Sequence, residues 1–398
     1  MKIWFIATRI AGNDGVSLEA ARWRDILTRM GHKVTFVAGE LDISGILIPE
    51  LRFNWPDVVE LHDKVLYGRN NYRKVESDIF TIAGKIEGKI RGVMNGRPPD
   101  LLIVANVFSL PMHFPLAVAL ARVIEEYKIP SVARHHDFWW ERKRFLKSSM
   151  FPFFARWFPP NLPQIKHVVI NSIAKAELTK RTGIAADIIS DCFDFGSKFN
   201  KSDSYSKKWR EDFGKKNDDT VFLQATRIVP RKRIEFSIKL VKKLKNPKAI
   251  LVIAGHSGDE GHDYELKLRE LIKKEKVRAI FVGDFVNSKR RIKTFYHKRG
   301  EPIRSRVYTL WDCFINSDYV VYPTEKEGFG NQFIEAVYFK KPIILTPYEV
   351  YKKDIEPLGF DVIKFGEKIR QVDVERNFEL GKKHFSFEAI EGKIKRLL

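Results

Sequence analysis

The chain has 398 residues, more than one hydrophobic core usually supports, so we expect two domains of about 200 residues each. Its 71 Lys and Arg against 50 Asp and Glu give a formal net charge of +21, which favours an anionic partner: nucleic acid, an acidic membrane or a phosphorylated substrate. The two cysteines, Cys192 and Cys313, are too few for a disulfide scaffold and fit a reducing cytoplasm. We expect no signal peptide, because Lys2 is followed by a short strand and not by an apolar h-region with a cleavage site. We expect no membrane span, because the longest apolar zone, 101–124, is interrupted by polar residues and prolines.

Strand and helix patterns alternate along the first half of the chain. Strands are expected at 2–7, 32–38, 101–105, 130–134, 167–171 and 187–190, and helices at 17–30, 72–94, 112–127 and 172–182. Gly15 lies between the first strand and a helix that we expect Ser17 to cap, a position where a diphosphate can bind. An ordinary tight connection is the alternative. Residues 41–75 are expected to form an irregular, substrate-facing insertion.

Two further segments of the first half carry candidate chemistry. His135, His136 and Asp137 follow the strand at 130–134, and such a cluster is either structural or, if further ligands joined it, a zinc site. Residues 145–163 are rich in aromatic residues, prolines and positive charge. They could dock on an acidic lipid surface or line an acceptor cleft, but we favour a packed loop between the domains.

The second half repeats the alternation after a polar connection at 196–219. Strands are expected at 220–225, 249–254, 279–282, 319–322 and 343–345, and helices at 264–274, 307–316, 333–339 and 387–398. Arg227 and Lys232 follow the first of these strands. Two cations flanking a turn suit a diphosphate, because a guanidinium chelates oxygens and an ammonium adds a point charge. A solvated charged face is the alternative.

Two glutamates flank a glycine turn between the strand at 319–322 and the next helix. Gly328 and Gly330 allow a ligand to approach the backbone there. If Asn331 caps the helix, Glu335 lies about one turn in, while Glu327 stays in the loop. Ionised carboxylates only accept hydrogen bonds, so sugar hydroxyls or cations are their natural partners. The alternative is a loop charge and a solvated helix residue.

Several motifs resemble those of one enzyme family. Glu327-Gly-Phe-Gly followed by Glu335-Ala resembles the E-x7-E signature of retaining glycosyltransferases of the GT-B fold, particularly glycosyltransferase family 4. Arg227 and Lys232 match the family's G-R-x4-K motif, and His136 is similar to the histidine of its H-D-[FL]-W loop. Thr226 stands where that motif has a glycine, and the usual Pro-Asn-Gly of the hinge is missing.

The resemblance implies an α/β chain with two doubly wound, Rossmann-like domains facing a central cleft. Residues 1–195 would bind the acceptor and 196–386 the nucleotide sugar, with the helix at 387–398 packing back on the first domain. The implied reaction is retaining transfer of a glucose- or mannose-type hexose from a UDP- or GDP-linked donor, without metal or cofactor. The acceptor would be a saccharide, a lipid-linked glycan or a small solute such as a glycerate derivative.

The resemblance also implies which side chains act. The residues implied in catalysis are His136, Arg227, Lys232 and Glu327. The residues implied in donor binding are Gly15, Arg227, Lys232, Glu327, Gly328, Phe329, Gly330, Asn331 and Glu335. Arg227 and Lys232 would hold the diphosphate, Glu327 the sugar hydroxyls and Glu335 the ribose. No general base is expected, since the leaving phosphate would take the acceptor proton.

Two other functions remain open from the sequence. A nucleic-acid-binding protein would also be basic, but no helix-turn-helix, zinc or aromatic RNA-binding motif occurs, so we expect no nucleic acid partner. A GT-B sugar-nucleotide epimerase would release free nucleotide without an acceptor. We expect a cytoplasmic enzyme, with peripheral contact to an acidic membrane as a further option.

Overall fold

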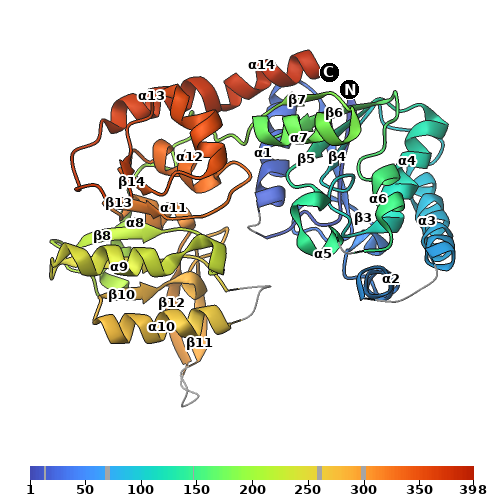
Figure 1. Cartoon of the computed structure of the whole chain (residues 1–398). Coiled ribbons are helices and arrows are strands. Elements are labelled where there is room, and N and C mark those ends of the chain that lie inside the picture. The colour runs from blue at the N-terminus through green and yellow to red at the C-terminus, as the bar shows by residue number, and fades with distance from the viewer. Residues whose placement is uncertain (13–14, 68–71, 147, 258–261, 297–301) are drawn as a thin grey trace. The chain divides into compact units, whose positions relative to one another are not determined.

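The chain divides into two compact units. The computed structural model describes residues 1–12, 15–67, 72–146, 148–257, 262–296 and 302–398 (Figure 1). Unit 1 comprises Met1–Asp191 and Ile390–Leu398, and unit 2 comprises Cys192–Ala389. The boundary expected at residue 195 thus lies just beyond the observed one at 191.

Unit 1 is built on a seven-stranded parallel sheet with the order β3-β2-β1-β4-β5-β6-β7. The strands are β1 Lys2–Ala7, β2 Lys33–Ala38, β3 Gly45–Leu47, β4 Leu101–Ala105, β5 Ser131–His135, β6 Ile165–Val169 and β7 Ala186–Ile188. β1 pairs with both β2 and β4, so the strand order reverses between β1 and β4. Ligands of open parallel sheets bind outside the carboxyl ends of the strands at such a switch point.

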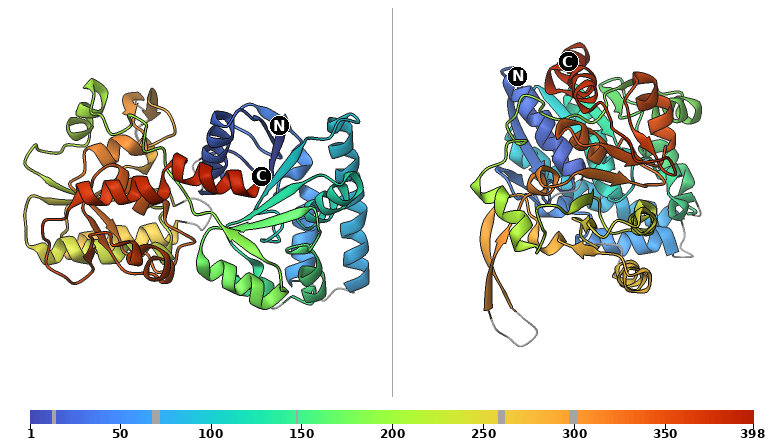
Figure 2. Two further views of the ribbon diagram at one scale, coloured as in Figure 1. Left: turned by 90° about the horizontal axis from the view of Figure 1, so that it is seen from above. Right: turned by 90° about the vertical axis from the view of Figure 1, so that its left-hand side faces the viewer.

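Helices cover both faces of this sheet (Figure 2). They are α1 Gly15–Arg29, α2 Pro56–Tyr67, α3 Tyr72–Met94, α4 Phe114–Tyr127, α5 Lys143–Leu146, α6 Phe151–Trp157 and α7 Ser172–Thr182. The last helix, α14 Phe387–Leu397, ends in unit 1, where Nζ of Lys166 donates a hydrogen bond of 2.6 Å to the carbonyl of Leu397.

The irregular structure expected for residues 41–75 is wrong for their described part, which contains β3, α2 and the start of α3 at Tyr72. Residues 68–71 lie outside the described ranges. His62 of α2 stacks on Phe114 with ring centroids 5.6 Å apart, and burial lowers the pKa of His62 to about 4. His62 is therefore a neutral packing residue of unit 1.

The aromatic segment 145–163 lies in the core of unit 1, so the expected loop between domains is also wrong. It contains all of α6 and the end of α5. Phe153 and Phe154 are fully buried, and the Phe154 ring stacks on Phe114 at 5.9 Å. The aromatic residues provide the apolar area that holds α4 and α6 together.

Unit 2 contains a six-stranded parallel sheet with the order β10-β9-β8-β13-β14-β15. Its strands are β8 Thr220–Gln224, β9 Ala249–Ile253, β10 Ala279–Phe281, β13 Tyr319–Tyr322, β14 Ile343–Leu345 and β15 Ile363–Lys364. Its helices are α8 Ser204–Asp212, α9 Ile234–Leu244, α10 Asp263–Glu275, α11 Leu310–Ile315, α12 Asn331–Tyr338 and α13 Val374–Phe385. Here the order reverses between β8 and β13.

An antiparallel hairpin of β11 (Arg291–Tyr296) and β12 (Pro302–Val307) extends from unit 2 (Figure 2). The sequence patterns did not predict it, nor α8, which holds its base. The hydroxyl of Tyr205 in α8 donates to the carbonyls of Arg291 and Val307, each at 3.0 Å. Hydrogen bonds from Arg290 to Asp312 and Asp203 raise the pKa of Arg290.

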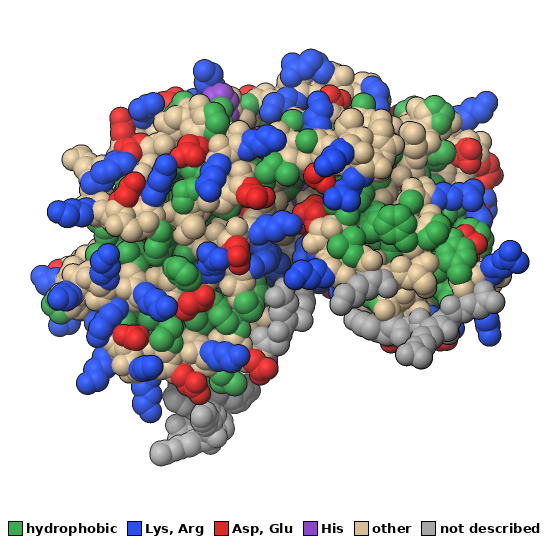
Figure 3. Space-filling model, in the orientation of Figure 1, with side chains coloured by type: hydrophobic (Ala, Val, Ile, Leu, Met, Phe, Trp, Pro, Cys, Tyr) green, Lys and Arg blue, Asp and Glu red, His purple; other side chains and the backbone are tan. Residues whose placement is uncertain are grey.

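The surface charge is mixed on the face drawn in Figure 3, where lysine and arginine side chains alternate with acidic ones. Within the described ranges, no helix has the length and apolar character needed to cross a bilayer.

Candidate functional site

Lys232 and Glu327 meet at the switch point of unit 2. Lys232 ends a 3-10 helix at Pro230–Lys232, after β8, and Glu327 lies in the loop after β13. Nζ of Lys232 donates a hydrogen bond to Oε1 of Glu327, and the hydroxyl of Thr324 donates to the same oxygen at 2.7 Å. The Lys232 and Glu327 side chains are only 10% and 11% exposed. The sequence placed them in separate motifs, and the fold joins them into one ion pair.

Burial and charge act against each other on this pair. Burial lowers the pKa of Lys232, and Glu327 opposes that effect. Burial alone would raise the pKa of Glu327, but the charges of Lys232 and Arg231 outweigh it, so the pKa of Glu327 lies below its ordinary value. Glu327 is therefore an ionised carboxylate at neutral pH. Nη1 of Arg231 lies 3.6 Å from Oε2 of Glu327 and adds a second positive charge.

Arg227 lies in the loop after β8 with its side chain exposed. The loop is fixed by the segment after β9: Ile228 donates its backbone N–H to the carbonyl of His256 at 2.9 Å. A Cβ atom at Gly255 would lie 1.7 Å from the carbonyl oxygen of Thr226, so only glycine permits this approach. The backbone of Arg227 is thus held in place while its guanidinium is open to solvent.

The glycine turn is closely packed behind the ion pair. α12 begins at Asn331, and Gly330, not Asn331, occupies the cap position with a φ of 125°. A Cβ atom at Gly330 would lie 2.4 Å from the hydroxyl of Tyr348, which donates to the carbonyl of Phe329 at 2.6 Å. The ring of Phe329 packs on Phe385 inside unit 2. The expected cap is wrong because the left-handed backbone and this contact both require glycine at position 330.

Glu335 is 3% exposed in α12, so the solvated helix residue considered from the sequence is excluded. Gly328 is half-buried in the loop that carries Glu327. Both glutamates of the signature are therefore largely withdrawn from water. Burying a carboxylate is costly unless it forms a hydrogen bond or an ion pair.

His136 lies in unit 1, after β5. Nη1 of Arg134 contacts Nε2 of His136 at 2.5 Å, and the backbone N–H of His136 donates to Oδ1 of Asn106 at 3.1 Å. Burial, and then the charge of Arg134, hold the pKa of His136 well below its usual value. His136 is therefore a neutral imidazole in a fixed orientation.

Arg134 is fully buried within a cluster of charges. Its Nη2 donates to Glu19 at 3.3 Å and to Asp191 at 3.1 Å, and Arg22 pairs with Glu19. Burial, together with the charge of Glu19, raises the pKa of Asp191 to about 7. The cluster fixes the arginine that in turn orients His136.

His135 has a structural role. Its Nε2 lies 2.9 Å from Nδ1 of His167, and the two rings stack with centroids 5.2 Å apart. Asp137 pairs with Arg142 at 2.8 Å. Among the residues that the structure describes, no group of three or more His, Cys, Asp or Glu is arranged to hold a metal ion.

Gly15 is the first residue of α1, so this helix starts two residues earlier than expected. Ser17 lies inside the helix and does not cap it: its hydroxyl accepts the backbone N–H of Ala11 at 3.2 Å. Residues 13–14, part of the predicted loop, lie outside the described ranges.

The predicted site residues thus divide between the units. Gly15 and His136 belong to unit 1, and the remaining predicted residues belong to unit 2. Sequence reasoning missed four residues that hold or accompany them: Asn106, Arg134, Arg231 and Thr324. Arg231 adjoins Lys232 in the chain and Arg134 adjoins His135, and this adjacency was a signal that could have found them.

Comparisons with known proteins identify relatives of the chain. The Glycosyl transferases group 1 family matches residues 206–359. The chain is 31% identical, over an alignment 448 positions long, to the mannosylglucosylglycerate synthase of Thermotoga maritima, covering 100% of this chain and 99% of that protein. It is 33% identical, over an alignment 398 positions long, to the synthase of the same name from Petrotoga mobilis, covering 92% of this chain and 87% of that protein.

Solved structures show the same fold at low identity. Anabaena Alr3699/HepE in complex with UDP and glucose matches with a TM-score of 0.64 at 14% identity, covering 100% of this chain and 99% of that one. The sucrose-phosphate synthase of Thermosynechococcus elongatus matches with a TM-score of 0.67 at 14% identity, covering 100% and 98%. With the two parallel sheets, these likenesses confirm the expected GT-B fold. By its full-length similarity to the two synthases, the chain belongs to the group 1 glycosyltransferases and is a hexosyltransferase.

Proposed function

We propose that this enzyme transfers mannose, with retention at the anomeric carbon, from a nucleotide sugar to a hydroxyl of glucosylglycerate. Its two relatives bear the name of the product of such a transfer, and the similarity covers nearly the whole chain. The donor is nucleotide-linked in this proposal because Alr3699/HepE, which shares the fold, has been solved in complex with UDP and glucose.

The observation that carries the proposal is the ion pair of Lys232 and Glu327 at the switch point of unit 2. Arg231 and the exposed Arg227 bring further positive charge to the same strand ends. In low-dielectric surroundings such cations stabilise the charge that develops on a departing diphosphate.

Each side chain then has a distinct role. Arg227 and Lys232 hold the diphosphate, Glu327 accepts hydrogen bonds from sugar hydroxyls, and buried Glu335 accepts those of the ribose. The bond from the anomeric carbon to the diphosphate breaks as the bond to the acceptor oxygen forms on the same face. The acceptor proton passes to the diphosphate, so no side chain acts as a general base.

We further propose that no divalent ion is required, since protein cations meet the diphosphate charge. A cytoplasmic location fits Cys192 and Cys313, which are both buried and form no disulfide.

The test is a transfer assay in which GDP-mannose, UDP-glucose and other nucleotide sugars are offered with glucosylglycerate, with and without EDTA. Formation of an α-linked product from an α-linked donor, followed by NMR of the anomeric proton and unaffected by EDTA, is the expected result. Release of nucleotide and an epimerised sugar in the absence of acceptor would identify an epimerase instead. An inverted product would overturn retention.

A further inference from the structure

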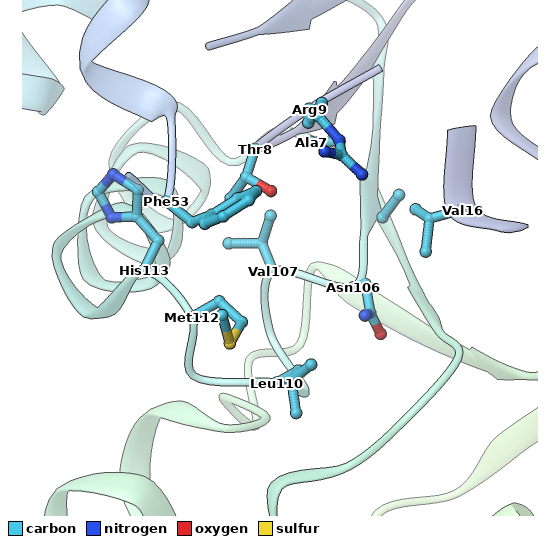
Figure 4. Close-up of a pocket in the computed structure, with 11 residues that line it drawn as sticks. Ala7, Thr8, Arg9, Val16, Phe53, Asn106, Val107, Leu110, Met112 and His113 are labelled. Atoms are coloured by element: carbon cyan, nitrogen blue, oxygen red, sulfur yellow. The ribbon is translucent and has the colours of Figure 1, made fainter. Parts of the chain in front are cut away.

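A cavity lies at the switch point of unit 1. It has a volume of about 150 Å³ and is lined by the segments that follow β1 and β4, together with Phe53. Arg9, Asn106 and Phe53 are among the side chains around it in Figure 4. Because the strand order reverses between β1 and β4, this is the position where a parallel sheet receives a ligand.

Asn106 presents a hydrogen-bond donor to this cavity. Its Oδ1 accepts the backbone N–H groups of His136 at 3.1 Å and Asp137 at 3.3 Å, and the hydroxyl of Ser109 at 3.0 Å. These three donors fix the amide orientation, so Nδ2 is the atom left for another partner. Within the described part of the chain, neither this nitrogen nor the hydroxyl of Thr8, which also lines the cavity, forms a hydrogen bond.

Arg9 brings a positive charge to the cavity. It is half-buried, with its guanidinium 5.8 Å from the centre of the Phe53 ring, and none of the described lining residues is acidic. His113 lines the cavity as a neutral ring: its Nε2 contacts the Glu50 carbonyl at 2.9 Å, and burial lowers the pKa of His113 to about 4. Val16, in the first turn of α1, also lines the cavity, so a helix amino end adds positive potential.

The volume limits what can enter. A cavity of about 150 Å³ holds a molecule of the size of benzene. A three-carbon hydroxy acid is on that scale, whereas a hexose ring with its hydroxyls is too large. Leu110 and Met112 supply an apolar wall suited to a short carbon skeleton.

We propose that this cavity is the acid subsite of the acceptor: Arg9 pairs with the carboxylate of a three-carbon hydroxy acid, and Nδ2 of Asn106 and the hydroxyl of Thr8 donate to its oxygens. A planar guanidinium can bind a carboxylate through two parallel hydrogen bonds. The inference rests on the proposed function, in which the acceptor is a sugar linked to glycerate. The sugar extends out of the cavity, and the acid end determines which acceptors are selected.

The test compares an acidic with a neutral acceptor. KM is measured for glucosylglycerate and for glucosylglycerol with the wild type, Arg9→Ala, Arg9→Lys and the surface control Arg97→Ala. Arg9→Ala should raise KM for glucosylglycerate by about tenfold to a hundredfold, the usual loss for hydrogen bonds between charged groups. The preference for the acid over the neutral acceptor should fall, and Arg9→Lys should restore part of it. The control should match the wild type.

Equal changes for both acceptors, or a rise in donor KM alone, would overturn the subsite. The latter result would place the donor diphosphate at Arg9. Asn106→Asp gives a second variant: it keeps the accepting oxygen but replaces the donor with a negative charge, so it should also weaken the acidic acceptor selectively.

A direct binding measurement separates this inference from the proposed function. Isothermal titration of the whole protein with D-glycerate should show binding that is lost in Arg9→Ala and in Asn106→Asp. If the wild type transfers mannose to no glycerate-linked acceptor but still binds glycerate through Arg9, the proposed function fails and the acid subsite stands. If transfer proceeds and glycerate binding does not depend on Arg9, the subsite fails alone.

Discussion

Arg134 donates a hydrogen bond from Nη1 to Nε2 of His136 at 2.5 Å, from a fully buried position. A guanidinium has only donors, so Nε2 of His136 must accept and its proton must reside on Nδ1. The imidazole can then offer an N–H group to a ligand but cannot take up a proton at Nε2 while Arg134 holds it.

This relationship predicts an NMR result. In a protein labelled with ¹⁵N-histidine, His136 should show the Nδ1–H tautomer and no titration between about pH 7.5 and 5.5, because burial and Arg134 keep its pKa well below the ordinary value. His136→Gln identifies the resonance. A titration midpoint near 6.5 would show that Arg134 does not hold the ring in this way.

We expect substitutions of Lys232 and Glu327 to have strongly non-additive effects on the free energy of unfolding. Lys232→Met leaves Glu327 buried without its main partner, so the free energy of unfolding should fall by about 3 kcal/mol or more. The double variant Lys232→Met/Glu327→Gln should recover much of that loss without recovering turnover. Chemical denaturation and kcat are measured on the same samples, with Lys267→Met as a surface control. Additive effects on stability would mean that the two side chains do not interact.

Arg227→Ala should separate activity from stability. The side chain is exposed, so the free energy of unfolding should change by no more than about 0.5 kcal/mol. Turnover should fall by about a hundredfold to a thousandfold, as when a group that stabilises transition-state charge is removed. Saturating kinetics and thermal unfolding check both expectations. Near-normal turnover would remove Arg227 from the diphosphate site.

Glu335→Gln should act mainly on the donor. The side chain is buried, and glutamine keeps its shape while removing the negative charge that would accept the ribose hydroxyls. The donor KM should rise by more than kcat falls, and the affinity for free nucleotide should fall in parallel. Glu379→Gln, on the exposed face of α13, is the matched control. Unchanged nucleotide affinity would argue against a ribose contact.

Asp191 predicts a pH dependence of stability. Burial and Glu19 raise its pKa from 3.8 to about 7 in the folded state, so the folded chain retains a proton that the unfolded chain releases. The contribution of Asp191 to the free energy of unfolding is therefore largest at low pH. It declines as the pH rises toward 7, by at most about 1.4 kcal/mol per pH unit.

The measurement is the urea midpoint of the wild type, Asp191→Asn and the exposed control Asp187→Asn at pH 5.5 and 8. The urea midpoint of Asp191→Asn, relative to that of the wild type, should be higher at pH 8 than at pH 5.5. The midpoint of Asp187→Asn should change with pH as the wild type's does. If the midpoints of Asp191→Asn and the wild type differed by the same amount at both pH values, Asp191 would be ionised throughout.

Elements with strong end signals were predicted closely. The helix at 172–182 agrees with α7, whose Asn171 cap accepts the backbone N–H of Ala174 and whose carboxyl end is closed by Gly183 with left-handed backbone. The strands at 319–322 and 343–345 agree with β13 and β14, which are short apolar runs buried on both faces.

Elements without such signals were missed. The hairpin of β11 and β12 is rich in arginine and lysine, so it lacks the apolar run that indicates a buried strand. α8 is highly polar and is fixed by contacts with that hairpin and with Asn316, whose side chain donates to the carbonyl of Ser206. Such elements depend on partners distant in sequence, which local patterns do not encode.

The sequence by itself determined the alternation of strands and helices, the two-domain organisation, and the motif positions of Lys232 and Glu327, because periodicity and glycine turns are local properties of the chain. Only the tertiary structure decided that these two residues form one buried ion pair, that Arg134 sets the tautomer of His136, and that Arg9 and Asn106 line one cavity. Two of these relationships, Lys232 with Glu327 and Arg9 with Asn106, join residues that follow different strands. The order of strands in a sheet, which brings them together, is fixed by packing across the whole domain.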